Sequence, residues 1–276
     1  MLARLLVLLL LIGAAFVGHA RAAGEPFPPI TDSDAVLRYS QSAIGRSLGD
    51  YSFLNAMRQP RTLAAYRGKP LVVNLIYTAC DASCPITVLA LGDAIEAADE
   101  LLGSDRFNAV TIGFDAKNDT PERMRAYADN AKLGAPNWEF LSGDPVTIDR
   151  LIHELGFVIA EEAGGYEHVA QTTVLDSKGR IFQHVYGANF EPPALVEPLK
   201  ALALSGDATP PGFAGLLDQV RLFCTSYDSA TGRYHLNYGT LIGLLIGALS
   251  LMAVLFLLVR AALRVYRASD APREPV

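Results

Sequence analysis

The stretch PLVVNLIYTACDASCPITVL, residues 70–89, decides how the rest of the chain is interpreted. Its first part, 70–77, is a largely apolar run that predicts a buried strand. Proline is tolerated at the first position of a helix, so Pro85 predicts a helix over residues 85–103. Cys80 and Cys84 then lie beside a helix N-terminus, whose partial positive charge favours thiolate. Thiolates attack disulfides and bind soft metals, so we expect the chain to work through these two sulfurs.

Further elements follow at regular intervals along the chain. The pattern predicts strands, a tight turn between the last two strands, and helices over these residues: strands 107–114, 138–141, 169–175 and 180–186, turn 176–179, and helices 119–131, 145–155 and 191–204. This succession, β-α-β-α-β-α-β-β-α, predicts an α/β domain whose central sheet is mixed and flanked by helices. Functional residues in such sheets gather at the carboxyl ends of strands, where the cysteine pair is expected.

The two ends of the chain predict export and membrane attachment. Residues 1–22 have one early positive charge, an apolar core and a small-x-small cleavage pattern, as in a secretory signal peptide. Residues 238–260 form a second apolar segment, long enough to cross a hydrocarbon core of about 30 Å. Arginines follow it, so by the positive-inside tendency the tail 261–276 is cytoplasmic. This topology predicts a protein of the bacterial cytoplasmic membrane with its functional domain on the periplasmic side.

The segment between domain and span is expected to be a linker with a membrane-proximal part, residues 205–237, that begins with a Pro/Gly-rich stretch. The net charge of −6 is modest and the basic residues are scattered, which excludes nucleic acid as an expected partner. Three cysteines are an awkward number for a disulfide framework in an exported protein. A functional dithiol plus one further cysteine fits that number better.

Several motifs occur together in a fixed order over residues 45–204. They are the stretch from Gly68 to Pro85 with its Cys-x-x-x-Cys-Pro ending, Asp-x-x-x-Asp-Thr-Pro-Glu at 115–122, Tyr-Glu-His at 166–168, and Asp-Ser-Lys-Gly-Arg at 176–180. In these residues the chain resembles the Sco/SenC family. The resemblance implies a thioredoxin-like fold exposed to the periplasm or its organellar equivalent. It also implies copper delivery to cytochrome c oxidase, with copper bound by Cys80, Cys84 and His168.

Copper also suits these residue types on chemical grounds. Thiolates are soft and suit Cu(I), while an imidazole also accommodates Cu(II). Only three residues separate Cys80 from Cys84, so one loop can present both sulfurs to one ion. A structural disulfide is the alternative, because export permits one. For His168, spacing alone favours a surface loop histidine, and only its position in the family motif favours a ligand.

Acidic residues near the predicted site have simpler explanations. Asp115 ends a strand at the same sheet edge as the dithiol, so it is a candidate for a hydrogen bond to a ligand. We expect Asp119 to cap the helix that follows it, and Glu122 to interact with the dipole of that helix. Cys224 is expected to be buried and inert, with metal transfer or pairing to a partner as the alternatives.

The remaining histidines carry no such expectation. We expect His153 to be a solvated helix residue and His184 a strand residue, while nothing assigns a role to His235. His19 would be removed with the signal peptide.

Two departures from the family pattern stand out. Many relatives have proline after the first cysteine, where this chain has Asp81, whose charge attracts a cation but opposes thiolate formation. Relatives are usually anchored at the N-terminus, whereas this chain is expected to be anchored at its C-terminus.

The functional hypothesis is therefore a membrane-tethered copper chaperone that delivers Cu(I) or Cu(II) to a respiratory oxidase. The expected recipient is cytochrome c oxidase subunit II, and other copper chaperones are possible partners. The alternative is a thiol–disulfide reductase that keeps the recipient's cysteines reduced, with Cys80 and Cys84 as its redox pair. A peroxiredoxin-like peroxidase fits less well, because it usually needs one activated cysteine beside an arginine and a threonine, and that set is not clearly present around Cys80.

Overall fold

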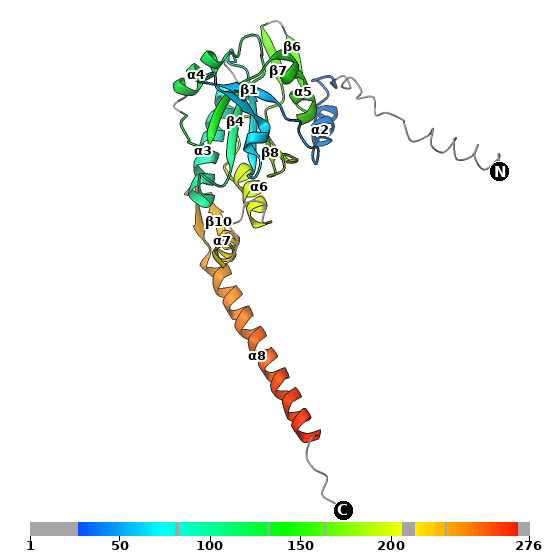
Figure 1. Ribbon diagram of the computed structural model, residues 1–276, viewed down its shortest axis with the longest axis vertical. Coiled ribbons are helices and arrows are strands. Elements are labelled where there is room, and N and C mark those ends of the chain that lie inside the picture. The colour runs from blue at the N-terminus through cyan, green and yellow to red at the C-terminus, as the bar shows by residue number, and fades with distance from the viewer. Residues whose placement is uncertain are drawn as a thin grey trace, which may run out of the picture.

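Figure 1 shows the computed structural model, which describes residues 27–80, 83–131, 133–162, 164–205, 213–229 and 231–269. Helices surround one sheet at one end of the molecule, and the long helix α8 (Tyr238–Ser269) projects from the other end. The predicted signal peptide, residues 1–22, lies outside the described residues. So do Asp81 and Ala82 of the dithiol loop.

The central sheet has seven strands in the order β2-β1-β5-β4-β3-β8-β9. Its middle consists of parallel strands: β3 (Leu71–Ile76), β4 (Asn108–Gly113) and β5 (Trp138–Ser142). Its two edges are antiparallel: β8 (Gln171–Leu175) and β9 (Ile181–Tyr186) on one side, β1 (Ser52–Asn55) and β2 (Pro60–Thr62) on the other. The predicted mixed sheet is confirmed, and its carboxyl edge carries the chain from β3 into the dithiol loop.

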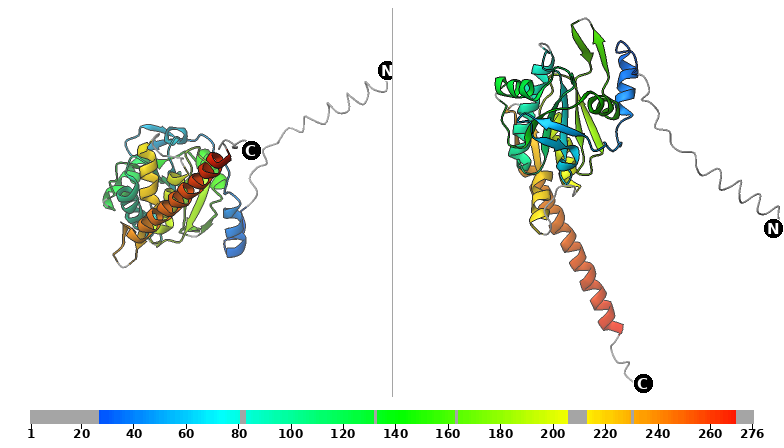
Figure 2. Two further views of the ribbon diagram at one scale, coloured as in Figure 1. Left: turned by 90° about the horizontal axis from the view of Figure 1, so that it is seen from below. Right: turned by 45° about the horizontal axis from the view of Figure 1, so that its top comes forward.

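Helices cover both faces of this sheet (Figure 2): α3 (Ser83–Leu102), α4 (Pro121–Asn130), α5 (Pro145–Leu155) and α6 (Pro193–Leu204). Alternate residues of β3 point to opposite faces. Val72 and Ile76 pack in the core that contains α3 and α6, whereas Val73 and Leu75 pack in the core that contains α5. Every residue of β3 is buried because both faces are covered, which explains its continuous run of mostly apolar residues.

The strands and helices predicted between residues 70 and 204 are all present, with bounds shifted by a few residues. The sequence interpretation missed these elements: α2 (Ser33–Gln41), β1, β2, the 3-10 helix η1 (Leu63–Tyr66), β6 (Ile159–Glu162), β7 (Gly165–His168), α7 (Phe213–Phe223), β10 (Thr225–Asp228) and β11 (Arg233–Leu236). The strands and the 3-10 helix among them have patterns too short to stand out without the partners against which they fold.

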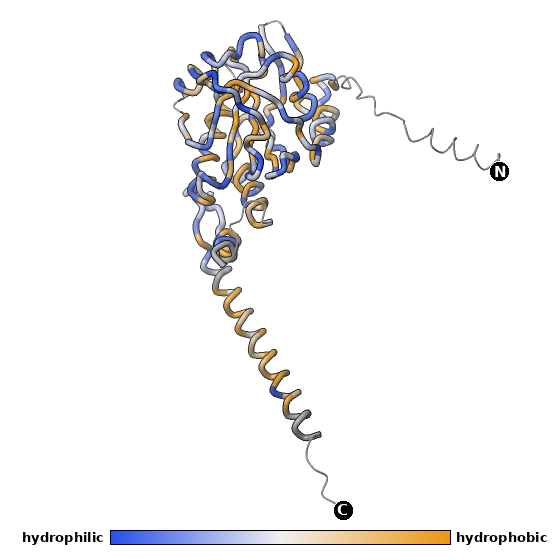
Figure 3. Tube along the Cα trace, viewed as in Figure 1, coloured by the Kyte–Doolittle hydropathy of each residue, from blue (hydrophilic) through white to orange (hydrophobic). Residues whose placement is uncertain are grey.

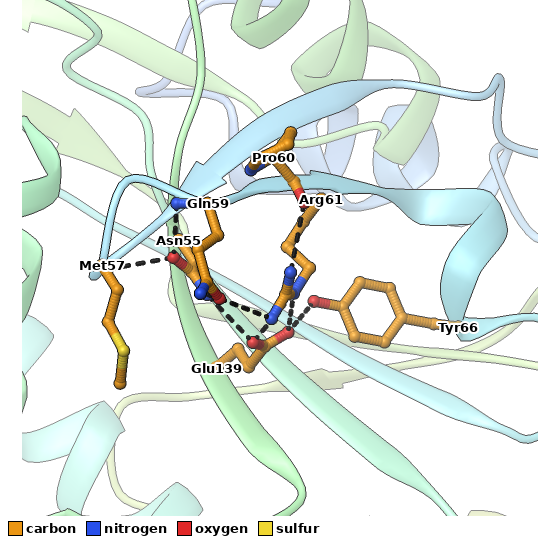
Figure 4. Close-up of polar contacts among 7 residues, drawn as sticks. All are labelled: Asn55, Met57, Gln59, Pro60, Arg61, Tyr66 and Glu139. Carbon is orange, nitrogen blue, oxygen red and sulfur yellow. Dashed lines mark hydrogen bonds and ion pairs between the residues drawn. The ribbon is translucent and has the colours of Figure 1, made fainter.

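Glu139 of β5 holds the β1–β2 hairpin to the parallel strands (Figure 4). Its carboxylate accepts hydrogen bonds from Arg61 Nε at 3.0 and 3.1 Å, from Asn55 Nδ2 at 3.4 Å and from the Tyr66 hydroxyl. Burial, together with the Glu139 carboxylate, raises the pKa of Tyr66. One carboxylate therefore ties a hairpin and the following 3-10 helix to the sheet.

The segment after α6 folds into a small unit that we call the C-terminal module: α7, β10 and β11. Arg221 Nη2 donates to the Leu101 carbonyl at 3.0 Å, and Lys200 Nζ donates to the Thr225 carbonyl at 2.6 Å. Arg106 and Asp218 form an ion pair at 3.0 Å. Of the expected linker 205–237, residues 206–212 and 230 lie outside the described part, and the remaining residues include the helix and two strands of the module.

Helix α8 follows the module directly. Residues Tyr238–Leu263 are long and apolar enough to cross a membrane by length and composition, and the apolar window is not buried in the structure. Figure 3 shows apolar residues along most of this helix. The helix continues beyond the expected span to Ser269, and residues 270–276 of the expected cytoplasmic tail lie outside the described part.

Candidate metal and dithiol site

The turn after β3 carries Cys80 to the start of α3. Cys80 N donates to the Tyr77 carbonyl at 3.1 Å, which closes the turn. Cys84 is the second residue of α3, and its backbone N–H donates to Cys80 Sγ at 3.4 Å. Both side chains are buried, with 8% of Cys80 and 1% of Cys84 exposed. Cys80 thus accepts one of the backbone N–H groups left free at the helix start.

No disulfide joins Cys80, Cys84 or Cys224 in the structure. Burial, with a further contribution from the neighbouring Cys80, raises the pKa of the Cys84 thiol. The expected preference for thiolate is therefore contradicted for Cys84, because burial disfavours the charged form of the thiol. A cation that binds this sulfur takes the place of its proton.

His168 comes to the dithiol from a separate hairpin. It is the last residue of β7, and its Nε2 lies 3.8 Å from Cys84 Sγ. Its other ring nitrogen, Nδ1, lies 3.2 Å from the Val169 carbonyl, which can only accept. Nδ1 therefore carries the hydrogen, so the lone pair of Nε2 points toward Cys84. Burial lowers the pKa of His168 and favours this neutral form, which is the form that binds metals.

Aromatic rings surround His168 and hold the hairpin over the dithiol. The ring centroids of Phe114 and Phe157 each lie 5.4 Å from that of His168, and the centroid of Tyr77 lies 6.2 Å away. The Tyr77 hydroxyl donates to the Tyr166 carbonyl of β7 at 3.5 Å. Tyr166 belongs to the Tyr-Glu-His motif, whereas the roles of Tyr77, Phe114 and Phe157 were missed at the sequence level. Tyr77 and Phe114 could have been found there, since each directly follows a parallel strand.

Asp119 does not cap α4, so the sequence interpretation was wrong. The cap is Thr120, whose side chain accepts from Arg123 N. The Asp119 carboxylate, 1% exposed, instead accepts from the backbone N–H and the hydroxyl of Thr78, at 2.8 and 2.7 Å. Its other oxygen accepts from Asp115 N at 2.9 Å. Asp119 joins the loop after β3 to the loop after β4.

Asp115 itself accepts from Asn118 Nδ2 at 2.7 Å. Its expected hydrogen bond to a metal ligand remains a prediction.

The other residues considered in the sequence lie elsewhere. Cys224 is 1% exposed at the junction of α7 and β10, as expected for an inert buried thiol. His184 lies in β9, as predicted, and is buried. His153 is partly buried and stacks on Phe27 at 4.3 Å, so its prediction as a solvated residue was wrong. The N-terminal segment that covers His153 was not anticipated.

The arrangement can bind a soft cation or exchange disulfides. Within the described part of the chain, no three His, Cys, Asp or Glu side chains already lie in a geometry that could hold a metal ion. Cys84 and His168 face one another, and Cys80 lies beside Cys84. A site with all three ligands requires these side chains to close around the ion.

Known proteins resemble this chain in sequence and in fold. The family model described as SCO1/SenC matches residues 40–204. The SCO1 protein homolog of Bacillus subtilis (strain 168) is 26% identical over 95 residues, which are 34% of this chain and 47% of that protein. The chain thus spans about half the length of this curated relative.

Two solved structures are also similar. A protein from Aquifex aeolicus VF5 described as an electron transfer protein has a TM-score of 0.53 at 22% identity, over 58% of this chain and 94% of that one. ScoI of Bradyrhizobium japonicum, solved with copper bound, has a TM-score of 0.49 at 24% identity, over 58% and 99%. The first of these likenesses supports the thioredoxin-like fold expected from the sequence.

Proposed function

The chain belongs to the SCO1/SenC family, and on that premise we propose that it is a membrane-tethered copper chaperone. It binds one copper ion through Cys80, Cys84 and His168 and passes the ion on by ligand exchange. The observation that carries this proposal is the opposition of Cys84 Sγ and the free lone pair of His168 Nε2, 3.8 Å apart. Two sulfurs and one imidazole suit copper in either oxidation state.

Copper is the cargo of this site, and the residues around it serve both capture and release. Since burial raises the pKa of Cys84, the incoming ion has to displace a proton from that thiol. A returning proton competes with the ion when copper leaves. The rings around His168 limit the freedom of the imidazole, so the ligand is already oriented when the ion arrives.

The remaining parts of the proposal concern place and partner. Helix α8 spans the bacterial cytoplasmic membrane, after export directed by residues 1–22, and the domain lies on the periplasmic side with residues after the span in the cytoplasm. The recipient is a respiratory oxidase, most directly the copper centre of cytochrome c oxidase subunit II. Apolar length and the arginines from Arg260 onward support the span.

The second candidate function is a thiol–disulfide reductase. It is favoured by the position of Cys80 Sγ, which accepts the Cys84 N–H at the start of a helix. In that reaction the dithiol gives two electrons and two protons to a target disulfide and becomes a Cys80–Cys84 disulfide. His168 is not required for this chemistry, and this separates the two candidates.

The test is a copper titration of the reduced full-length chain in detergent without oxygen. We expect one tightly bound copper per chain, loss of binding in Cys80→Ser and Cys84→Ser, and affinity at least tenfold weaker in His168→Ala. Cys224→Ser is the matched control and should bind normally. Normal binding by His168→Ala would remove His168 from the site. No tight binding, together with reduction of a protein disulfide, would establish the reductase instead.

A further inference from the structure

We propose that Asp119 is a positioning residue of the dithiol site, which holds Thr78 and thereby sets the place of Cys80 relative to α3. This inference rests on the proposed function, because it concerns the same two sulfurs, those of Cys80 and Cys84. Asp119 lies in the loop after the carboxyl end of β4, and it would position the loop after the carboxyl end of β3.

The contacts of Asp119 are directed at the segment just before Cys80. One carboxylate oxygen takes both donors of Thr78, the N–H at 2.8 Å and the hydroxyl at 2.7 Å. The second oxygen takes Asp115 N at 2.9 Å, which anchors the carboxylate to its own loop. Thr78 is two residues before Cys80, whose N–H is bonded to Tyr77 at 3.1 Å. Movement of Thr78 is therefore transmitted to Cys80 through a closed turn.

The backbone around Asp119 leaves space for this one side chain. A Cβ at Gly113 would lie 2.4 Å from Asp119 Cβ, closer than real Cβ contacts, so this position at the end of β4 has to lack a side chain. A carboxylate that is 1% exposed is costly to bury unless donors surround it. Three such donors converge here, and two of them belong to the loop that leads to the dithiol.

We call the hydrogen bonds from Thr78 to the Asp119 carboxylate the clamp. Asp119→Asn tests it with little change in the shape of the side chain. An amide has one acceptor oxygen, so either orientation turns an NH₂ group toward an N–H donor, at Thr78 or at Asp115. Thr78→Val removes only the hydroxyl contact, whereas Thr78→Ser retains it. Asp144→Asn is the matched control, because the Asp144 carboxylate also accepts from two backbone N–H groups and a threonine hydroxyl, but at the start of α5.

Two measurements on the full-length chain in detergent report on sulfur geometry: the Cu(I) dissociation constant, and the equilibrium constant of the Cys80–Cys84 disulfide with glutathione. We expect Asp119→Asn to change both about tenfold, which corresponds to about 1.4 kcal/mol. Thr78→Val should change both in the same direction by less. Thr78→Ser and Asp144→Asn should stay within about twofold of the wild type.

A folded Asp119→Asn variant with wild-type values in both measurements would overturn the clamp. If Asp119→Asn does not fold, Thr78→Val decides: wild-type values in that variant overturn the proposal, and the expected shift supports it. Absence of copper binding in the wild type would instead overturn the chaperone function. In that case the glutathione equilibrium still tests the position of the two sulfurs.

Discussion

Contacts at both ring nitrogens of His168 determine the tautomer and the orientation of its imidazole. The Val169 carbonyl accepts from Nδ1 and so determines which nitrogen keeps its lone pair. The lone pair on Nε2 then faces Cys84. Rings of Phe114 and Phe157 fill the remaining space around it. A histidine held in this way can donate to a metal with little reorganisation.

A second histidine, His184, should make stability depend on pH. It lies buried in β9, with Nδ1 2.9 Å from the Thr173 hydroxyl and 3.1 Å from Gln171 Nε2. An amide nitrogen only donates, so Nδ1 accepts and the ring is neutral. Burial lowers the pKa of His184 to about 4, and the Ser40 carbonyl opposes this shift only in part.

Because the pKa of His184 is lower in the folded than in the unfolded chain, the unfolded chain binds more protons between about pH 4 and the ordinary histidine value near 6.5. The contribution of neutral His184 to the free energy of unfolding is therefore complete above pH 6.5 and is lost as the pH falls through 4. The loss is at most about 3 kcal/mol. Denaturant unfolding of the wild type and His184→Gln at several pH values measures this. The variant should depend less on pH in this range, whereas His235→Gln, on the exposed strand β11, should match the wild type.

At the scale of elements, partly and fully buried carboxylates join segments that the chain order leaves apart. Glu139→Ala should destabilise the protein by about 1–3 kcal/mol, because it leaves the Tyr66 hydroxyl without its acceptor and removes one of the two acceptors of Asn55 Nδ2. Glu122→Ala is the matched control. It also removes a glutamate paired with an arginine, Arg58, but both side chains are largely exposed, so no measurable change in stability is expected. Equal losses in the two variants would contradict the role given to Glu139.

The C-terminal module is a second element that depends on a few polar contacts. Lys200 is 8% exposed, and its Nζ bonds the first residue of β10, Thr225, at 2.6 Å. Lys200→Met keeps most of the side-chain length but leaves that carbonyl without a donor, so the module should open locally. Hydrogen exchange should become at least tenfold faster in residues 225–236, while β3 remains protected. Unchanged exchange in the module would show that Lys200 does not hold it.

At the scale of the whole molecule, the site and the proposed span lie at opposite ends of the domain. Cys84 begins α3, and the Leu101 carbonyl near its end is bonded to Arg221 of the module from which α8 departs. At 1.5 Å per residue, that part of the helix is about 26 Å long. Figure 1 shows α8 pointing away from β6 and β7, the hairpin of His168. The recipient of copper would then present its own site well above the membrane surface.

Spin labels on the full-length chain in lipid nanodiscs test this geometry. In a background with serine at all three cysteines, we place cysteine at Glu167, beside His168, or at Glu100, which lies near the module. Paramagnetic lipid headgroups should relax a label at residue 100 strongly and one at residue 167 hardly at all. Equal relaxation of both labels would contradict the orientation. A chain that does not insert would contradict the span itself.

Much of this architecture was predictable from the order of residues. The dithiol after a covered strand, the helix from about Pro85 and the later βα units follow from local patterns of period and capping, and each was found within a few residues. The helix α4 shows where such patterns mislead. Asp119 is of a residue type that often caps helices. Its carboxylate instead accepts from the backbone N–H and hydroxyl of Thr78, which is far away in the chain, and Thr120 caps the helix.

The sequence by itself determined the fold class, the dithiol at the end of β3 and the apolar C-terminal helix, because each depends on residues close together in the chain. Only the tertiary structure decided that burial raises the pKa of Cys84, that His168 faces it through Nε2, and that Asp119 bonds Thr78. Those facts depend on residues about 40 to 85 positions apart, which the sheet brings together. Burial and hydrogen bonding at such a distance are properties of packing, which no local pattern encodes.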